Sequence, residues 1–318
     1  MDSKLKLHPA QALTDRFLGF VKGVHRALRR SPRAKGLLYR LEGQVLSLLE
    51  RQRDFYTSKN DYPYFRLSLI QGTFEPETVR YLRSRLGPGA RVVDVGAHVG
   101  YYTRLFSDLV GPEGKVIAFE PEPTNYALLS RNLRRARNVL LLNLAVAHLE
   151  GHLDFFVPSK GTRWSRLSLE QGQQVDELLK EKSGGLIHHR VQVRPLGRVL
   201  QEHGLGQYPI DLLKIDVEGA EIWVLQSLGE LSNQVKEVVC ELAPENLRAF
   251  GYGVEDLFLS LHGLGFQRYG FLDPVAGEGE PYPLPSRGEW FGMDEALDLL
   301  RSLQPWPKGL VINVVAQR

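Results

Sequence analysis

From Val79 onward, short runs rich in β-branched residues and leucine alternate with stretches of helical periodicity, and this alternation limits the fold more than any other feature. Helical patterns begin at about 101 and recur at about 124–136, 219–228 and 254–263. Strands that alternate with helices usually pair in parallel, and the helices cover both faces of the sheet. The sequence therefore predicts a doubly wound α/β sheet, with strands at "RVVDVG", "KVIAFEP", "NVLLLNLAV", "DLLKIDV", "EVVCELA" and "GLVINVVAQ".

Two segments interrupt this rhythm. Residues 158–190 are polar and contain glycine, and residues 271–308 are rich in proline and glycine. Both are longer than the usual connections between elements of a compact domain. We expect them to be inserts in the main domain.

The N-terminal part is amphipathic and basic. Apolar residues at helical spacing predict two helices, at 10–30 and about 37–55. Residues 1–60 hold 13 of the 40 Lys and Arg residues but 5 of the 37 Asp and Glu residues, which leaves 27 basic and 32 acidic residues for the remainder. The sequence therefore predicts a basic helical extension at 1–60 and one domain at 61–318.

The apolar stripes of residues 10–55 need a partner. They would suit a lid on the domain, a second copy in a homodimer, or the surface of a membrane. Nucleic acid is disfavoured as a partner, because the main domain is acidic and the basic N-terminal residues are not interleaved with aromatic ones.

The compartment is indicated by cysteine usage and by the lack of long apolar runs. A single cysteine, Cys240, excludes an intramolecular disulfide. No apolar run approaches the ~20 residues of a membrane span, and the N-terminus lacks an uncharged core and a cleavage site of signal type. We expect a cytoplasmic protein, associated with a membrane if residues 10–55 bind lipid.

The first strand runs into a glycine-containing turn, "VVDVGAHVGYYT". Gly96 and Gly100 flank a turn that opens a helix, where the backbone can approach a ligand and free N–H groups are available. Asp94 replaces the first glycine of the dinucleotide-binding pattern. A carboxylate there suits a ligand with an ammonium group, because it would repel a pyrophosphate.

The second strand, "VIAFEPEP", ends with Glu120. An acid at this position of a βαβ unit can accept hydrogen bonds from both hydroxyls of a ribose. A ligand with an amino-acid end and an unphosphorylated ribose is S-adenosylmethionine, so the sequence predicts this cofactor.

These motifs, together with "NLAV" before "EG" and above all "LLKIDVEGAE", resemble those of the FkbM family of S-adenosylmethionine-dependent methyltransferases. The resemblance runs from about Val92 to Glu245. It implies a class I methyltransferase fold, a Rossmann-like sheet of seven strands with the last one antiparallel, and O-methylation of hydroxyls on sugars and secondary metabolites. By position, it also implies contacts with the methionine end, the ribose and the adenine from Asp94, Gly96, Ala97, Gly100, Glu120, Pro121, Asn143, Ala145 and Val146.

Two positions depart from the family pattern. His98 stands where the family commonly has asparagine, so a titratable side chain replaces a neutral amide among the cofactor-binding residues. The stretch "VRPLGRVL", residues 193–200, stands where relatives carry an acidic "LD" pair. Any family role of that acid is therefore in question for this chain.

The stretch "DLLKIDVEGAE" carries the candidate catalytic residues. Read as a strand of period two, it places Lys214, Asp216 and Glu218 on one face. We expect Asp216 beside the cofactor's methyl group, where it would accept a proton, stabilise the sulfonium or coordinate a divalent cation. Lys214 would keep Asp216 ionised, Glu218 would contact substrate or lie at a helix start, and Glu221 is expected on a solvated helix face.

Weaker candidates lie in the first insert. One of the adjacent histidines could reach the pocket, and His188 is the candidate base or metal ligand. "GTRWSRLS" supplies Arg163, Trp164, Ser165 and Arg166 as a platform for a sugar or a phosphate. No set of residues has the spacing of a known metal site, so the metal ligands stay undefined.

The sequence thus favours an S-adenosylmethionine-dependent O-methyltransferase whose acceptor is a sugar-containing compound or a secondary metabolite. Two alternatives remain open at this point. One is an RNA ribose methyltransferase with Lys214 and Asp216 in a Lys/Asp/Lys/Glu site, and the other is a binding protein that keeps the cofactor fold without turnover.

Overall fold

The computed structural model describes residues 32–159, 166–168, 185–276, 280–282, 284 and 289–318. The chain divides into two compact units, with the boundary between Phe74 and Glu75. The predicted boundary at residue 60 stays a prediction; it lies just ahead of helix α3 (Pro63–Gln71). None of the described helices combines the length and the apolar composition needed to cross a bilayer.

The first unit contains α2 (Pro32–Arg53) and α3. Helix α2 coincides with the predicted helix at 37–55, whereas the predicted helix at 10–30 lies outside the described residues. A buried ion pair between Arg66 Nη2 and Glu50 Oε1, 2.9 Å apart, joins the two helices. Thr57 also donates to this Glu50 oxygen, so the buried charge is fully paired.

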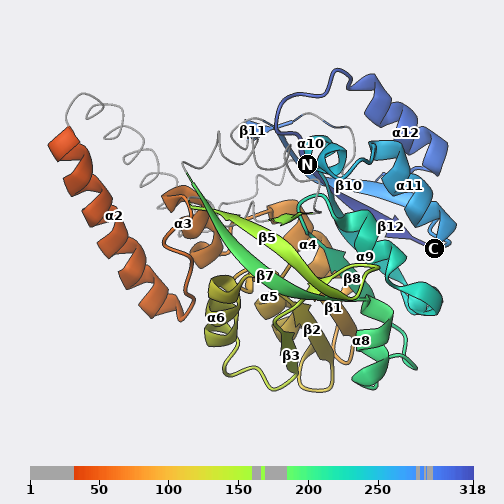
Figure 1. Ribbon diagram of the computed structural model, residues 1–318, viewed down its shortest axis with the longest axis horizontal. Helices are drawn as coiled ribbons and strands as arrows, with labels where there is room; N and C mark the ends of the chain where they lie inside the picture. The colour runs from red at the N-terminus through yellow and green to blue at the C-terminus, as the bar shows by residue number, and fades with distance from the viewer. Residues whose placement is uncertain (1–31, 160–165, 169–184, 277–279, 283, 285–288) are drawn as a thin grey trace, which may run out of the picture. The chain divides into compact units, whose positions relative to one another are not determined.

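The second unit is built on a sheet with the strand order β11-β10-β12-β9-β8-β1-β2-β3 (Figure 1). Neighbours from β9 to β3 pair in parallel, and β12 runs antiparallel to both β9 and β10. Apart from the two-residue edge strand β11, this is the predicted seven-stranded sheet with its last strand antiparallel. The strands are β1 (Arg91–Val95), β2 (Lys115–Phe119), β3 (Val139–Leu142), β8 (Leu212–Ile215), β9 (Glu237–Leu242), β10 (Arg268–Ala276), β11 (Glu280–Pro281) and β12 (Val311–Gln317).

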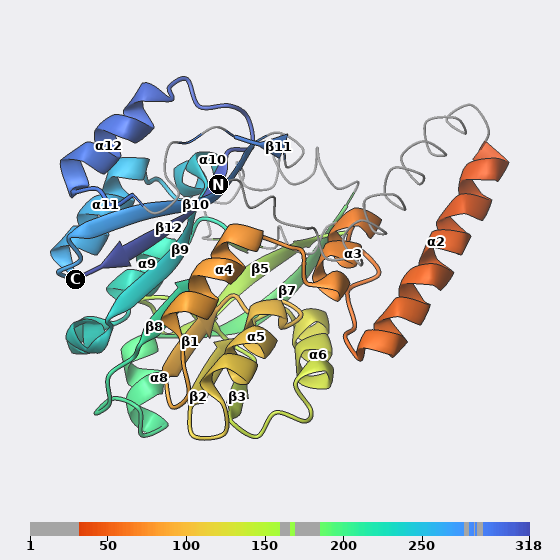
Figure 2. The ribbon, with the colours of Figure 1, turned by 180° about the vertical axis from the view of Figure 1, so that it is seen from behind.

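Helices cover both faces of this sheet. Helices α4 and α5 lie in front of it in Figure 2, whereas α8, α9 and α11 lie in front in Figure 1. The helices are α4 (Pro76–Arg85), α5 (Tyr101–Val110), α6 (Pro123–Asn132), α8 (Leu196–Glu202), α9 (Glu221–Gln226), the 3₁₀ helix η2 (Gly229–Gln234), α10 (Pro244–Ala249), α11 (Val254–Gly263) and α12 (Met293–Ser302).

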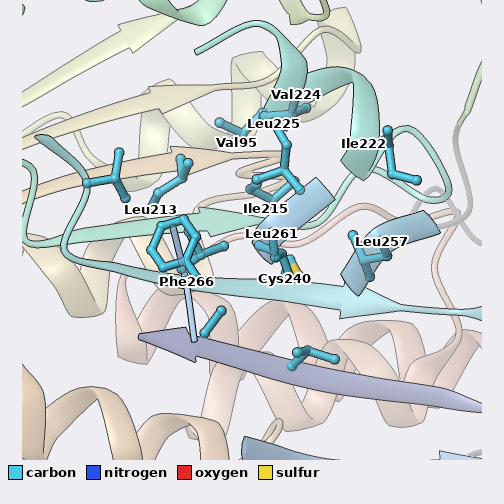
Figure 3. Packing of buried hydrophobic residues seen from close by; sticks show 14 of the residues in the cluster. Val95, Leu213, Ile215, Ile222, Val224, Leu225, Cys240, Leu257, Leu261 and Phe266 are labelled. Atoms are coloured by element: carbon cyan, nitrogen blue, oxygen red, sulfur yellow. The ribbon is translucent and has the colours of Figure 1, made fainter. Parts of the chain in front are cut away.

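The α9–α11 side holds the largest apolar core. Strand residues Val95, Leu213 and Ile215 pack there with side chains of α9 and α11, and none is more than 1% exposed (Figure 3). Because side chains alternate along a strand, Asp94 and Lys214 lie on the opposite face, toward α5. They are also register partners in the parallel pair of β1 and β8, so two charged residues are neighbours under one helix.

A second sheet was not predicted. It has the order β4-β7-β5-β6 and consists of β4 (Ala145–Val146), β5 (Gly151–Pro158), β6 (Arg166–Ser168) and β7 (Leu186–Arg194). "NVLLLNLAV" is therefore not one strand, because Asn143 and Leu144 separate β3 of the main sheet from β4 of the second. Long antiparallel pairing of β5 with β7 satisfies the backbone of both strands, and Phe155, Val157, Val191 and Val193 form a buried apolar cluster with Trp223.

Candidate active site

The glycine loop brings the ends of β1, β2 and β8 together. Gly96 has φ +87°, and a Cβ there would lie 1.8 Å from the carbonyl oxygen of Asp216, so a side chain is excluded. The N–H groups of Gly96 and Ala97 donate to the Phe119 carbonyl at 3.0 and 2.9 Å. Gly100, at φ +91°, begins α5 against Leu129. The loop thus holds the predicted cofactor residues beside the predicted catalytic aspartate.

Asp94 lies near the carboxyl end of β1 and is fully buried. Its Oδ2 accepts a hydrogen bond from Thr103 Oγ1 at 2.6 Å, whereas its Oδ1 has no hydrogen-bond partner among the described residues. Burial raises the pKa of Asp94, and the ammonium of Lys214 opposes that rise. An unpaired buried carboxylate oxygen is costly unless a ligand completes it.

Glu120 is held by the backbone of the loops around it. Its Oε2 accepts from the N–H of His98 at 2.8 Å, and its Oε1 accepts from the N–H of Glu122 at 2.9 Å. Burial raises its pKa to about 8, against the lowering effect of these two bonds. Each oxygen keeps a lone pair that could accept from a hydroxyl.

The loop after Glu120 is fixed in turn. Asn143 Nδ2 donates to the carbonyls of Glu120 and Pro121, at 2.8 and 3.1 Å. Pro121 is partly exposed and Ala145 is 4% exposed at the start of β4. The structure therefore gives Asn143 a positioning role that its sequence position alone did not show.

Lys214 and Asp216 form a pair at the end of β8. Lys214 is 2% exposed, and its Nζ lies 2.9 Å from Asp216 Oδ2 and 4.6 Å from the centre of the Tyr102 ring. Burial works against the charge of Lys214, but Asp216, Asp94 and Glu75 together raise its pKa. The ammonium is therefore retained as the counter-ion of this site.

The predicted strand face of three charges is wrong in one respect. Strand β8 ends at Ile215, so only Lys214 is in the strand, and Asp216 and Glu218 follow in the turn. Glu218 has φ +56° and accepts from Asn246 Nδ2 at 2.7 Å. Because the turn redirects the chain, Asp216 and Glu218 approach Glu241 on β9: each of the three offers a carboxylate oxygen within 4.8 Å of the others.

Glu221 is also not where the sequence placed it. It is 1% exposed, and its Oε1 accepts from the N–H groups of Val217 and Gly219 at 3.3 and 3.1 Å. Burial raises its pKa to about 7. Glu221 therefore stabilises the turn after β8 from a buried position, because it accepts hydrogen bonds from backbone N–H groups of that turn.

Glu75 is a site residue that the sequence did not indicate. It precedes α4 with φ +44°, and its Oε2 accepts from Tyr102 Oη at 2.5 Å and from Asn313 Nδ2 at 2.9 Å. Burial, and after it the charge of Asp216, raise the pKa of Glu75 to about 7, while Lys214 opposes the rise. Glu75 thus lies within electrostatic range of the Lys214–Asp216 pair, on a part of the chain with no recognisable motif.

The residues fit S-adenosylmethionine on two structural grounds. The unpartnered Oδ1 of Asp94 can accept from an ammonium group, and the glycine loop beside it leaves no room for a side chain at Gly96. Glu120 stands at the neighbouring strand end with its carboxylate fixed by backbone donors. The contacts of Asp94 with the amino-acid end and of Glu120 with the ribose of the cofactor stay predictions.

Comparison with known proteins agrees with this geometry. A family model described as the methyltransferase FkbM domain matches residues 94–268, more than half of the chain. The chain belongs to the FkbM methyltransferase family. Its methyl donor is S-adenosylmethionine.

Individual members and structures are similar at low identity. Methyltransferase sdnD of Sordaria araneosa is 29% identical over 52% of this chain and 73% of its own length. The 31-O-demethyl-FK506 methyltransferase FkbM of Streptomyces tacrolimicus is 29% identical over 65% of this chain and 85% of its own. A solved FkbM methyltransferase of Methylobacillus flagellatus aligns with TM-score 0.40 and 13% identity, over 85% of this chain and 57% of that one.

The two adjacent histidines of the first insert lie on β7 of the second sheet. The His188 side chain is 54% exposed, and its Nε2 lies 2.8 Å from Asp154 Oδ1 on β5. His189 Nε2 lies 3.5 Å from Oε1 of Glu122, a residue that caps α6. Among the described residues, the ion pair of His188 is with Asp154 and not with the carboxylates of Asp216, Glu218 or Glu241. Its catalytic role remains a prediction.

Two further predictions concern the platform for a sugar or a phosphate and the departure from the family's acidic pair. The platform at residues 163–165 lies outside the described residues, as does the side chain of Arg166. At the departure from the family's acidic pair, Gly197 packs so closely that a Cβ would lie 2.5 Å from the Leu228 carbonyl oxygen. An acidic side chain would therefore not fit at Gly197 in this chain.

Proposed function

We propose that this FkbM-family enzyme methylates a hydroxyl oxygen of a sugar-containing compound or a secondary metabolite. The observation that supports it is the position of Asp216, a partly buried carboxylate beside the glycine loop with a retained ammonium as its counter-ion. One relative is named for methylation at an oxygen of FK506. A site rich in carboxylates suits removal of a proton from an uncharged hydroxyl.

The chain's own residues would act as follows. When bound, S-adenosylmethionine supplies a methyl group on a positively charged sulfur. Asp94 and Glu120 hold its two ends, and the glycine loop places the methyl near Asp216. The Asp216 carboxylate would accept the proton of the acceptor hydroxyl as that oxygen takes up the methyl group.

Lys214 would be a positioning residue in this reaction. Its ammonium holds the Asp216 carboxylate in place, since Lys214 Nζ and Asp216 Oδ2 lie 2.9 Å apart. The second and third carboxylates, Glu218 and Glu241, count against an RNA acceptor, because they would repel phosphates beside the reacting hydroxyl. We therefore do not favour RNA ribose methylation.

Asp216→Asn tests the proposal. The amide keeps the shape of the side chain but cannot accept the proton in the same way, so turnover should fall by about 100-fold to 10,000-fold. Binding of S-adenosylhomocysteine, followed by calorimetry, should remain close to that of the wild type. Unchanged turnover would overturn the role of Asp216, and an absence of turnover on all hydroxylated acceptors with tight cofactor binding would favour a binding protein.

We further propose that α2 forms an interface with a second copy of the chain. Leu41, Val45 and Leu48 follow one another at helical spacing, and their exposed fractions are 50%, 37% and 66%. Replacing all three with Ser should shift the chain to a smaller species in analytical ultracentrifugation. Sedimentation of the wild type with anionic vesicles, but not of this variant, would instead identify a membrane contact.

We propose a reducing compartment such as the cytoplasm, because the single cysteine, Cys240, is buried in β9 and has no cysteine partner. Location of a tagged chain by microscopy would test this.

A further inference from the structure

We propose that the carboxylates of Asp216, Glu218 and Glu241 form a binding site for one hard divalent cation, of the Mg²⁺ or Mn²⁺ class, at the reacting end of the enzyme. The sequence pattern indicates no ligand set for such a site, because its three residues come from two different segments of the chain. The proposal rests on the proposed function only in placing the cation beside the acceptor.

The geometry of the three residues is the first observation. Asp216 and Glu218 lie in the turn after β8, and Glu241 lies near the end of the neighbouring parallel strand β9. One carboxylate oxygen from each lies within 4.8 Å of the others. Oxygens bound to one cation at about 2.1 Å are spaced by about 3 to 4 Å, so small side-chain movements would bring them to a common ion.

The second observation is independent of that spacing. Glu241 Oε1 is shielded from solvent and has no hydrogen-bond partner among the described residues. Asp216 and Glu218 each have a donor, the ammonium of Lys214 and the amide of Asn246. Glu241 thus has a shielded carboxylate oxygen without a donor and belongs to a group of three carboxylates, which calls for a positive charge that the described side chains do not supply at Glu241.

The chemistry of the ligands limits the identity of the cation. All three ligand atoms are carboxylate oxygens, which suit Mg²⁺, Mn²⁺ or Ca²⁺ and do not select zinc or copper. Three protein ligands leave positions for water or for a hydroxyl of the acceptor. Lys214 remains on the other side of Asp216, bound to Oδ2, so Oδ1 of that residue is the oxygen that the site would use.

Mn²⁺ binding to the full chain, without cofactor or acceptor, tests the site. Calorimetry and the loss of the free Mn²⁺ signal in electron paramagnetic resonance should both show one bound ion, which Mg²⁺ displaces. Glu241→Gln should weaken binding by more than about 10-fold. The matched control is Glu237→Gln, because Glu237 lies on the same strand, is buried and also has an unpartnered Oε1, but belongs to the opposite end of β9.

The outcomes separate this site from the proposed function. Binding that is lost in Glu241→Gln and retained in Glu237→Gln, with both variants folded by circular dichroism, supports the site. Absence of Mn²⁺ binding in the wild type, or equal binding in both variants, overturns it. Glu218→Gln gives a second test if Glu241→Gln does not fold. Because S-adenosylhomocysteine binding is measured separately, loss of the cation site would leave the methyltransferase assignment standing.

Discussion

The two sides of the active site both hold carboxylates that are buried or partly buried, but they satisfy them in different ways. On the cofactor side, Glu120 accepts two hydrogen bonds from backbone N–H groups. On the acceptor side, Asp216 pairs with the ammonium of Lys214, and Oε1 of Glu241 has no donor among the described residues. The first arrangement is fixed by the fold itself, whereas the second depends on a balance of side-chain charges.

This difference has a physical meaning for the reaction. Backbone donors hold a carboxylate in one place, so Glu120 suits a ligand that must be bound in one orientation. Charged side chains that face one another change their protonation when a partner arrives or leaves. The acceptor side is therefore the part where a proton or a cation can be exchanged, and the cofactor side is the part that stays the same.

The largest expected effect comes from removing the Lys214 ammonium from the acceptor side. Lys214→Met leaves Asp216 and Asp94 without their shared counter-ion in a buried place, so the free energy of unfolding should fall by about 3 to 5 kcal/mol. Urea denaturation followed by fluorescence measures this. Lys236→Met is the control, because the Lys236 side chain is 61% exposed and its pair with Asp211 should contribute no more than about 1 kcal/mol.

Equal losses in Lys214→Met and Lys236→Met would contradict the comparison, since they would mean that burial does not make the acceptor side depend on its ammonium. A loss confined to Lys214→Met would confirm that the charges there need one another.

On the cofactor side, pH should reveal the state of Glu120. Burial raises its pKa to about 8, with smaller rises from Glu122 and Asp94 and opposition from its two backbone bonds. With this raised pKa, the Glu120 carboxyl keeps its proton at neutral pH. The ionised carboxylate, which would accept hydrogen bonds from the ribose hydroxyls, is the main form only above about pH 8. The dissociation constant of S-adenosylhomocysteine should therefore fall about 10-fold between about pH 7 and about pH 9.

The matched variant for this prediction is Glu120→Gln. It has no carboxyl to titrate, so its weaker binding should change less with pH than that of the wild type, and the difference isolates Glu120 from the ligand's own amino group. The cofactor-free wild type should also lose stability as pH rises from about 4.5 to about 8, because the folded state prefers the protonated carboxyl. Parallel pH curves for both proteins would show that Glu120 does not control binding.

The same comparison explains which site residues could be predicted from the sequence. Asp94, Gly96 and Glu120 lie at or just after the ends of strands and precede helices within short motifs, so the local pattern places them. Glu241 could have been found from one signal, since it closes the strand after "DLLKIDV" and parallel strands end at the same edge. Glu75 could not be predicted, because hydrogen bonds from Tyr102 and Asn313 hold it at the site, and both residues lie far from it in the sequence.

The second sheet shows the corresponding limit for the fold. The parallel strands of the main sheet are buried on both faces and read as continuous apolar runs. Strands β5 and β7 mix polar and apolar residues, and they pair from Gly151–Val193 to Pro158–Leu186 on either side of the first insert. Without a short turn between the two strands, the sequence pattern gives no sign that they pair.

The smallest expected effect concerns the contact that joins Glu75 to the acceptor side. Tyr102→Phe removes the hydroxyl that donates to Glu75 but keeps the ring beneath the Lys214 ammonium. Asn313 still donates to the same carboxylate oxygen, so the loss in free energy of unfolding should be about 1 kcal/mol.

The Tyr102 hydroxyl lowers the pKa of Glu75, which burial raises to about 7, so the hydroxyl stabilises the ionised form of Glu75. Urea denaturation should therefore show a larger loss at about pH 8.5 than at about pH 5.5. A loss that is the same at both values would mean that this bond does not distinguish the two protonation states, and that Glu75 belongs with the fixed carboxylates of the cofactor side.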